Sequence, residues 1–208
     1  MTGFFPENTA YALCRISQSK HNLHSDEENY ISKASEKRRR EFVAGRQCAK
    51  LACNLLGSPT EKILRNPDRS PIWPENIVGS ISHSNHVSGA IVSYNQYYAG
   101  LGLDIEKNHP LKDSVIEYFT NPEEYRYIKK SGYDYLGPLF FSAKESVYKC
   151  ISQALNIKLN FSDISINIDD QNTYSVVFKK HEIKNVNFIG RYKVKKFHIY
   201  SLAATTIC

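Results

Sequence analysis

Residues 100–106 read Gly-Leu-Gly-Leu-Asp-Ile-Glu, and most of them belong to a strand that the sequence predicts over Tyr97–Ile105. Because side chains alternate between the two faces of a strand, Asp104 and Glu106 point the same way, roughly 7 Å apart. Such a pair of carboxylates suits Mg²⁺ beside a phosphate-bearing substrate. An Asp-x-Glu at a strand end is also common in solvated turns, so the motif needs support from elsewhere in the chain.

A second stretch, residues 141–149, reads Phe-Ser-Ala-Lys-Glu-Ser-Val-Tyr-Lys and lies in a helix predicted near Leu139–Leu155. Glu145 and Lys149 are four residues apart, so they share one helix face and offer a carboxylate beside an ammonium group. On its own, such a pair is more often a surface ion pair worth a few tenths of a kcal/mol. Together with the strand carboxylates it favours a binding site.

A long helix is predicted earlier in the chain, over Ser35–Leu56. Small or apolar residues recur along it at spacings of four and three, and Gly57 follows directly, as at many helix ends. The basic run Lys37–Arg40 opens this helix and forms either a solvated face or part of an anion site. A strand is predicted at Ile77–Ser82, and the segment that begins at His83 is either a short helix or a strand.

The second half shows the same order of elements. Asn121, Pro122 and Glu124 mark a helix start, with a cap, a proline at the first helical position and a capping-box glutamate. From Ile164 onward the sequence predicts an antiparallel meander. We therefore expect an α+β fold with α/β-type lobes: two similar, pseudo-twofold-related lobes, each a helix packed on a mainly antiparallel sheet. The predicted lobes are residues 1–104 and 105–208, forming a single compact unit with the site at their interface.

Composition narrows the class of protein. The chain has 208 residues, of which 41% are hydrophobic and 23% charged, and its formal net charge is +6. No apolar run approaches the roughly 20 residues that span a bilayer, and no leader is recognised, which predicts a cytoplasmic protein. The positive charge favours a nucleic acid, a nucleotide cofactor or an acidic protein as partner. The five cysteines form no Cys-x-x-Cys motif, and we expect reduced core residues rather than metal ligands.

Five motifs occur in a fixed order between Lys37 and Lys149. They are Arg-x-Glu-Phe-x-Ala-Gly-Arg (39–46), Arg-x-Pro-x-Trp-Pro (69–74), Gly-Ser-Ile-Ser-His-Ser (79–84), Gly-Leu-Asp-Ile-Glu (102–106) and Phe-Ser-x-Lys-Glu-Ser-x-Tyr-Lys (141–149). The ordered set resembles the 4′-phosphopantetheinyl transferases and is most similar to the Sfp/EntD type. One position departs from the pattern, because Phe141 stands where the family commonly has Trp.

The resemblance implies that the 4′-phosphopantetheine arm of coenzyme A is transferred to a serine of an apo carrier protein, leaving adenosine 3′,5′-bisphosphate. The implied pathway is nonribosomal peptide, siderophore or polyketide biosynthesis. A monomer is expected, because two lobes complete the site within one chain. The implied residues are as follows: Asp104, Glu106 and Glu145 for Mg²⁺; Lys37, Arg40, Arg46, Ser82 and His83 for the 3′-phosphate; Arg69 for the adenine loop; Lys149 for the pyrophosphate; and Glu145, Lys149 and Glu106 for catalysis, with Glu145 favoured over Glu106 as the base.

Three other functions remain open from the sequence. The chain could be a non-catalytic module that binds nucleotides or acidic proteins, although the intact acidic and basic motif residues argue against it. It could bind nucleic acid through the helix that starts near Lys37, but no nucleic-acid module is recognised. A different phosphoryl-transfer enzyme is conceivable, yet the sequence lacks a Gly-x-x-x-x-Gly-Lys-Ser/Thr loop.

Overall fold

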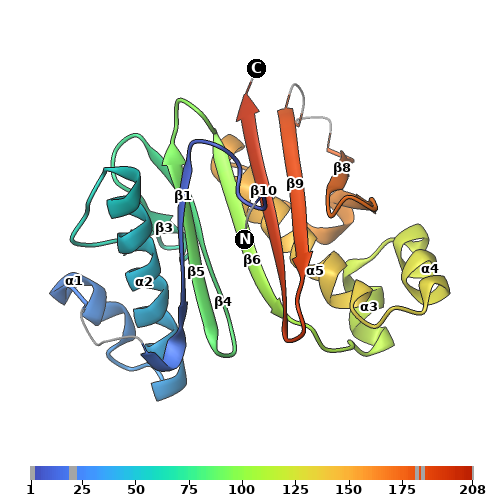
Figure 1. Cartoon of the computed structure of the whole chain (residues 1–208), viewed down its shortest axis with the longest axis horizontal. Coiled ribbons are helices and arrows are strands. Elements are labelled where there is room, and N and C mark those ends of the chain that lie inside the picture. Colours follow the sequence, from blue (N-terminus) through green and yellow to red (C-terminus); the bar gives the residue numbers. More distant parts are fainter. Residues whose placement is uncertain (1–2, 19–22, 181–182, 184–185, 208) are drawn as a thin grey trace.

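Two three-stranded antiparallel sheets lie side by side at the centre of the molecule (Figure 1). The structure, a computed structural model, describes residues 3–18, 23–180, 183 and 186–207. The first sheet has the order β1-β5-β4, and the second has the order β6-β10-β9. The strands are β1 (Thr9–Arg15), β4 (Ile77–Ser84), β5 (Val87–Tyr94), β6 (Gly100–Lys107), β9 (Val186–Val194) and β10 (His198–Ile207). The repeated order confirms an α+β fold with two similar halves.

One long helix packs on each sheet. The first, α2 (Glu36–Leu56), packs on β1 and β5 through small residues such as Ala49 and Ala52, both fully buried. Ser35 caps its start by accepting a hydrogen bond from the Arg38 amide, and Gly57 ends it in the left-handed conformation at φ +87°. This helix confirms the prediction for Ser35–Leu56.

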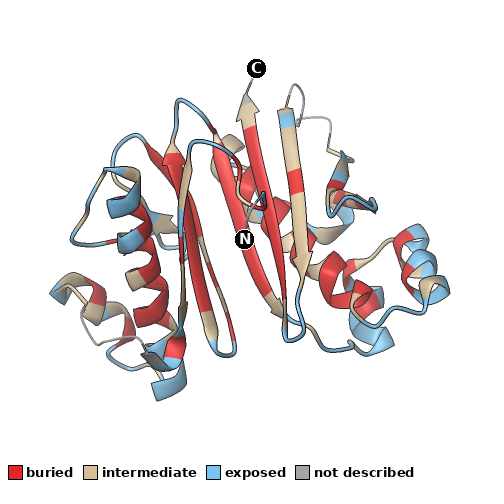
Figure 2. Cartoon of the chain, viewed as in Figure 1, coloured by how far each residue is buried: buried red, intermediate tan, exposed pale blue. Residues whose placement is uncertain are grey.

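The second long helix, α5 (Leu136–Leu155), packs on β6 and β10. It begins three residues before the predicted Leu139. The helix can include Pro138 because this proline lies in its first turn, where an amide proton has no hydrogen-bond acceptor within the helix. Asn156 ends it in the left-handed conformation at φ 53°. Of the buried residues in Figure 2, many follow the central strands and the inner faces of these two helices.

The glycines of residues 100–106 explain how α5 approaches β6. A Cβ atom on Gly102 would overlap the carbonyl oxygen of Ser146, and one on Gly100 would overlap that of Cys150. These glycines alternate with Leu101 and Leu103, which are fully buried in the core on the other face of the strand. The face toward α5 is therefore bare at its first two positions, and it continues into Asp104 and Glu106.

The smaller elements also repeat in the two halves. The first half contains α1 (Ser25–Glu28) and the strand pair β2 (Leu64–Arg65) and β3 (Pro71–Ile72); the second contains α3 (Asp113–Phe119), α4 (Pro122–Ser131) and the pair β7 (Ile164–Ile168) and β8 (Tyr174–Phe178). Single 3-10 turns occur at Ile16–Gln18, Asn29–Ile31 and Phe161–Asp163. The capping box predicted at Asn121 and Glu124 is present at the start of α4.

The structure resolves one choice that the sequence left open and corrects one expectation about the strands. The segment after His83 forms the strand β5, which resolves the choice between helix and strand. The strands after Ile164 do not form a single meander, because β7 and β8 make their own pair and β10 lies between β6 and β9. Pairing of β10 with β6 joins segments about a hundred residues apart, which local patterns do not reveal. The predicted lobe boundary at residue 104 falls inside β6, which pairs with β10 from Gly100 to Lys107.

The two halves meet where β4 and β6 lie side by side, and we call this junction the seam. Both strands are fully described, and no backbone ladder joins them. Side chains join them instead. Ser80 Oγ donates to the Leu103 carbonyl at 3.4 Å, and Gln153 of α5 bridges both strands, donating to the Gly79 carbonyl at 3.0 Å and accepting from the Leu101 amide at 3.1 Å.

Two further expectations concern the whole chain. No helix within the described ranges has the length and apolar character needed to cross a bilayer. The described cysteines, Cys14, Cys48, Cys53 and Cys150, are free thiols, and the last three are buried, as expected for core residues. Cys208 lies outside the described residues.

Candidate active site

A basic pocket of about 150 Å³ opens between α2 and β4, and arginines gather around it. Its basic lining residues are Arg38, Arg46, Arg65, Arg69 and His83. Arg46 is the most enclosed of them, because its guanidinium lies 4.4 Å from the centre of the Phe42 ring and only 6% of the residue is exposed. Burial lowers the pKa of Arg46 to about 10, and its Nε has no hydrogen-bond partner within the described part of the chain. A buried arginine with a free donor suits an anionic ligand.

His83 is placed at the mouth of this pocket by β4. Arg38 Nη1 lies 2.8 Å from His83 Nε2, and Glu41 Oε2 lies 3.6 Å from Arg38 and 3.9 Å from His83 Nδ1. Burial lowers the pKa of His83, Glu41 opposes that shift, and the charges of Arg38 and Lys149 add to it. His83 is therefore held neutral, with Nε2 accepting from Arg38.

A central cavity of about 620 Å³ lies over the seam and adjoins the basic pocket, with which it shares Arg69, Pro71 and Ile81. Lys149 reaches into it from α5. Its Nζ donates to Oδ1 of Asp104 at 2.6 Å and to the Leu103 carbonyl at 3.1 Å. The ammonium group predicted from the second motif is thus placed beside the first carboxylate of the strand motif.

Asp104 is held by side chains from two other elements, α5 and β4. Its Oδ1 accepts from Lys149 of α5 and, at 3.1 Å, from the hydroxyl of Ser82 on β4; that same hydroxyl accepts from the Ile105 amide at 3.1 Å. The second oxygen, Oδ2, is buried and has no hydrogen-bond partner among the described residues. Asp104 therefore keeps one oxygen available for a further ligand.

The three carboxylates influence one another electrostatically. Burial, and secondly the charge of Asp104, raise the pKa of Glu106 to about 7. Burial also raises the pKa of Glu145, with Lys149 opposing and Asp104 adding to the shift. As the side chains stand, no three His, Cys, Asp or Glu residues of the described chain are grouped closely enough to hold a metal ion. The free Asp104 oxygen and the mutual repulsion nevertheless fit a divalent cation, which would relieve that repulsion.

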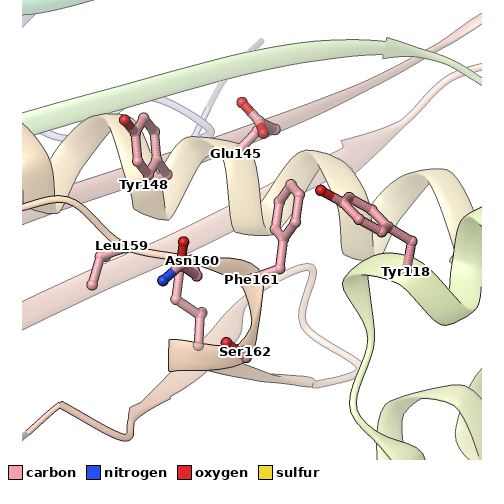
Figure 3. A pocket seen from close by; sticks show the side chains of 8 residues that line it. Tyr118, Glu145, Tyr148, Leu159, Asn160, Phe161 and Ser162 are labelled. Carbon is pink, nitrogen blue, oxygen red and sulfur yellow. The ribbon is translucent and has the colours of Figure 1, made fainter.

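An aromatic groove of about 350 Å³ continues from the central cavity, with which it shares Tyr148. Figure 3 shows Glu145 and Tyr148 on α5, with Tyr118 of α3 and Phe161 of the 3-10 turn Phe161–Asp163 around the same space. Tyr118 is 79% exposed, an unusual setting for a large aromatic side chain. Leu159 and Ile164 complete the apolar lining. The groove thus offers one carboxylate among aromatic and apolar side chains, and Asn160 and Ser162 add polar atoms to its lining.

The structure brings most of the predicted residues together along this path. Arg46, Arg69 and His83 line the basic pocket, Ser82 and Asp104 meet at the seam, Lys149 lines the central cavity and Glu145 lines the aromatic groove. The remaining two predicted phosphate ligands lie on the exposed face of α2, where Lys37 is 3.9 Å from Glu41 and Arg40 is 2.8 Å from Glu36. Their role in phosphate binding stays a prediction.

Sequence reasoning missed two residues of the basic pocket. Arg38 belongs to the basic run of α2, in which the register of the four residues was open. Arg65 lies on β2, where its guanidinium is 4.5 Å from the centre of the Tyr30 ring, and it belongs to none of the five motifs. Gln153, which bridges the seam, lies one helical turn beyond the last motif residue and carried no signal of its own.

Comparison with known proteins covers both halves. The model of the 4′-phosphopantetheinyl transferase N-terminal domain matches residues 26–93, and that of the 4′-phosphopantetheinyl transferase superfamily matches residues 100–201. The transferase Npt of Nocardia iowensis is 36% identical over 61% of this chain and 57% of its own length. The transferase Svp of Streptomyces mobaraensis is 33% identical over 74% and 64%. Enterobactin synthase component D of Escherichia coli (strain K12) is 26% identical over 83% and 80%.

This chain therefore spans between half and two thirds of the length of Npt and Svp.

Proposed function

The chain belongs to the 4′-phosphopantetheinyl transferase superfamily, of the Sfp/EntD type, and we propose that it transfers 4′-phosphopantetheine from coenzyme A to a serine of an apo carrier protein. One observation carries the proposal. The basic pocket, the central cavity with Lys149 and the aromatic groove with Glu145 adjoin one another in that order. A nucleotide phosphate, a diphosphate and an acceptor hydroxyl require these same three environments in the same order.

The basic pocket would bind the 3′-phosphate of coenzyme A. Arg38, Arg46 and His83 converge there, and guanidinium groups bind phosphate through paired, charge-assisted hydrogen bonds. Arg69 and Pro71 lie between this pocket and the central cavity, in a position to flank the adenine. Lys37 and Arg40, at the start of the same helix, would add attraction at longer range.

Lys149 would contact the diphosphate from the floor of the central cavity. Its ammonium adds positive charge where negative charge accumulates as the bisphosphate leaves. A Mg²⁺ ion held by Asp104, Glu106 and Glu145 would supply further charge neutralisation at the diphosphate. Ser82 keeps Asp104 oriented toward the seam through its hydrogen bond.

Glu145 would act as the general base. Glu145 lines the aromatic groove, and its raised pKa makes it a better proton acceptor than an ordinary glutamate. The serine hydroxyl proton passes to Glu145 as the serine oxygen bonds to the phosphorus attached to pantetheine. The bond from that phosphorus to the oxygen that bridges the two phosphates breaks, and adenosine 3′,5′-bisphosphate leaves. Glu106 remains the second candidate for this role.

The acceptor would be an acidic carrier protein of nonribosomal peptide, siderophore or polyketide biosynthesis. The net charge of +6 supports an acidic partner. Of the exposed aromatic residues, Tyr118 lines the groove beside Glu145, and Tyr127 lies on the neighbouring helix α4. The similarity to enterobactin synthase component D supports a nonribosomal peptide carrier. We expect a monomer to be active.

Intact-mass spectrometry of several apo carriers, incubated with coenzyme A, Mg²⁺ and this protein, tests the proposal. A gain of one phosphopantetheine on any carrier is expected, and the ranking of carriers identifies the pathway. Omission of Mg²⁺ with a chelator serves as the control and should abolish the gain. Coenzyme A binding without modification of any carrier would instead favour a non-catalytic nucleotide-binding module.

A further inference from the structure

Each half contains a buried glutamate that the proposed reaction does not use. In the first half this is Glu27 of α1, which completes a capping box by accepting from the His24 amide at 2.9 Å. The same carboxylate accepts from Lys50 of α2 at 2.6 Å and from the Ile63 amide at 2.9 Å. Three segments of the first half are thereby fastened to one carboxylate.

The second half repeats this arrangement, bond for bond. Glu124 of α4 accepts from the Asn121 amide at 2.8 Å, from Lys144 of α5 at 2.7 Å and from the Ile166 amide at 2.8 Å. We call each arrangement a clasp: a capping-box glutamate, a lysine of the long helix and the amide of a residue in or next to the two-stranded pair. The repetition identifies the clasp as part of the fold that both halves share.

The two lysines differ in what else they contact. The Lys50 side chain is 20% exposed, whereas that of Lys144 is 1% exposed. Lys144 also donates to the Phe119 carbonyl at 2.8 Å and to the Phe161 carbonyl at 3.2 Å. An ammonium group has three donors, and here all three have an oxygen acceptor.

The two carbonyls that Lys144 binds belong to the walls of the aromatic groove. Phe161 lines the groove directly, and Phe119 directly follows Tyr118, which lines the groove next to Phe161. The Tyr118 and Phe161 rings meet edge to face with their centres 6.1 Å apart, and Phe141 packs on both Phe119 and Phe161. Lys144 thus anchors the backbone of two adjacent segments, at Phe119 and Phe161, that carry the aromatic lining of the groove.

Among the described residues, none of the hydrogen-bond partners of the Lys144 ammonium group belongs to the coenzyme A side of the site. Phe119, Glu124 and Phe161 are absent from the described linings of the basic pocket and the central cavity. Glu145, the next residue along α5, lines the groove that those walls form. Lys144 and Glu145 are therefore adjacent in sequence but differ in position: Lys144 binds backbone carbonyls behind the groove, and Glu145 lines it.

We propose that Lys144 is a positioning residue, which holds the two aromatic segments that line the groove beside Glu145 and thereby determines the binding of the protein acceptor. This inference rests on the proposed function. It assigns the acceptor to the aromatic groove and gives the buried lysine a role that the corresponding Lys50 does not have. Coenzyme A binding should not depend on it.

The test separates positioning from stability. Lys144→Met fills the same space but removes the charge and all three donors, so the buried carboxylate of Glu124 loses its counterion. The double variant Glu124→Gln/Lys144→Met also removes that unpaired charge, so its melting temperature should recover most of the loss. Neither variant can hold the Phe119 and Phe161 carbonyls. Lys50→Met is the matched control, because it breaks the other clasp.

We expect both Lys144 variants to raise KM for the apo carrier by about tenfold, with kcat within about threefold of the unmodified chain. The Kd for coenzyme A, measured by calorimetry, should change less than about twofold. Lys50→Met should lower the melting temperature while leaving the carrier KM within about twofold. A double variant that regains both stability and the original KM would overturn the inference, as would parallel losses of coenzyme A and carrier binding.

A binding measurement keeps this inference separate from the proposed reaction. An apo carrier with its acceptor serine replaced by alanine is titrated against each variant, without any turnover. Weaker binding to the double variant than to the unmodified chain supports the role of Lys144 whether or not transfer is detected. Equal binding overturns that role alone, and a chain that neither binds nor modifies any carrier overturns both conclusions.

Discussion

The ammonium nitrogen of Lys149 lies 2.6 Å from Oδ1 of Asp104, and this ion pair joins the long helix of the second half to its first strand. The two side chains differ in exposure, with 28% for Lys149 and 6% for Asp104. Lys149 can therefore turn toward a ligand in the central cavity, whereas Asp104 cannot leave the seam. Because Asp104 is buried, its negative charge needs either Lys149 or a bound cation beside it.

Lys149→Met should remove that neighbour and leave Asp104 buried without a counterion. We expect a loss of about 2–3 kcal/mol in the free energy of unfolding, measured by urea denaturation. Because the variant lacks the competing ammonium, added Mg²⁺ should raise its melting temperature more than that of the unmodified chain. Lys129→Met removes an exposed pair of nearly equal length, 2.7 Å from Asp113, and should change stability little. Equal losses in the two variants would contradict this account.

Glu145→Gln should abolish transfer while leaving coenzyme A binding measurable. The amide keeps the size of the side chain but cannot take the serine proton, so kcat should fall by about a thousandfold. Calorimetry should give a coenzyme A Kd within about threefold of the original. Glu117→Gln, on the exposed face of α3, is the control and should turn over normally. Normal turnover by Glu145→Gln would remove Glu145 from the mechanism.

His83 should link coenzyme A binding to proton uptake. Burial and the charges of Arg38 and Lys149 lower its pKa below the ordinary 6.5, against the attraction of Glu41 and Asp104. A group with a depressed folded pKa stays neutral, so the stability of the free protein declines as pH falls from 6.5 through the folded pKa. A bound phosphate dianion raises that pKa again.

Calorimetry near pH 6.5, in buffers of different ionisation enthalpy, measures the protons taken up on binding. We expect a fraction of a proton for coenzyme A and less for dephospho-coenzyme A, which lacks the 3′-phosphate. His83→Gln should remove the difference between the two ligands and flatten the acid loss of stability. The same uptake for both ligands would place the 3′-phosphate away from His83.

Gly102→Ala should separate α5 from β6. The added Cβ meets the backbone carbonyl of Ser146 rather than a flexible side chain, so the whole helix has to shift. We expect a loss of about 3 kcal/mol or more in the free energy of unfolding, together with weaker coenzyme A binding. Gly137→Ala is the matched control within α5, because its nearest neighbour is the Ile116 side chain at 3.2 Å. That change should cost no more than about 1 kcal/mol, since alanine favours a helix.

The sequence predicted those parts of the fold whose signals are local. Ser35 and Gly57 marked the ends of α2, and Asn121 with Glu124 marked the start of α4, because a cap and its partner lie within a few residues of each other. The position of β10 between β6 and β9 was beyond such signals, since it depends on pairing across about a hundred residues.

The motifs predicted individual residues of the candidate site but not the contacts between them. The motifs named Ser82, Asp104 and Lys149, yet only the fold brings the three together at one carboxylate oxygen. Glu124 was recognised as a capping residue, and its second role as the partner of Lys144 was not. A lysine inside a motif is expected to reach solvent or substrate. Complete burial of Lys144 depends on carbonyls from two other segments, which no sequence spacing encodes.

At the seam, the distance between the two halves is set by side chains rather than by a backbone ladder. Peptide ladders space strands at a fixed interval whatever the sequence, but here the interval between β4 and β6 depends on the reach of Ser80, Ser82 and Gln153. Replacing one of these side chains with a longer or shorter one would change the width of the central cavity without breaking a backbone hydrogen bond of either sheet. Single substitutions at the seam would therefore change how the central cavity fits the proposed diphosphate, while the cores of both halves stay unchanged.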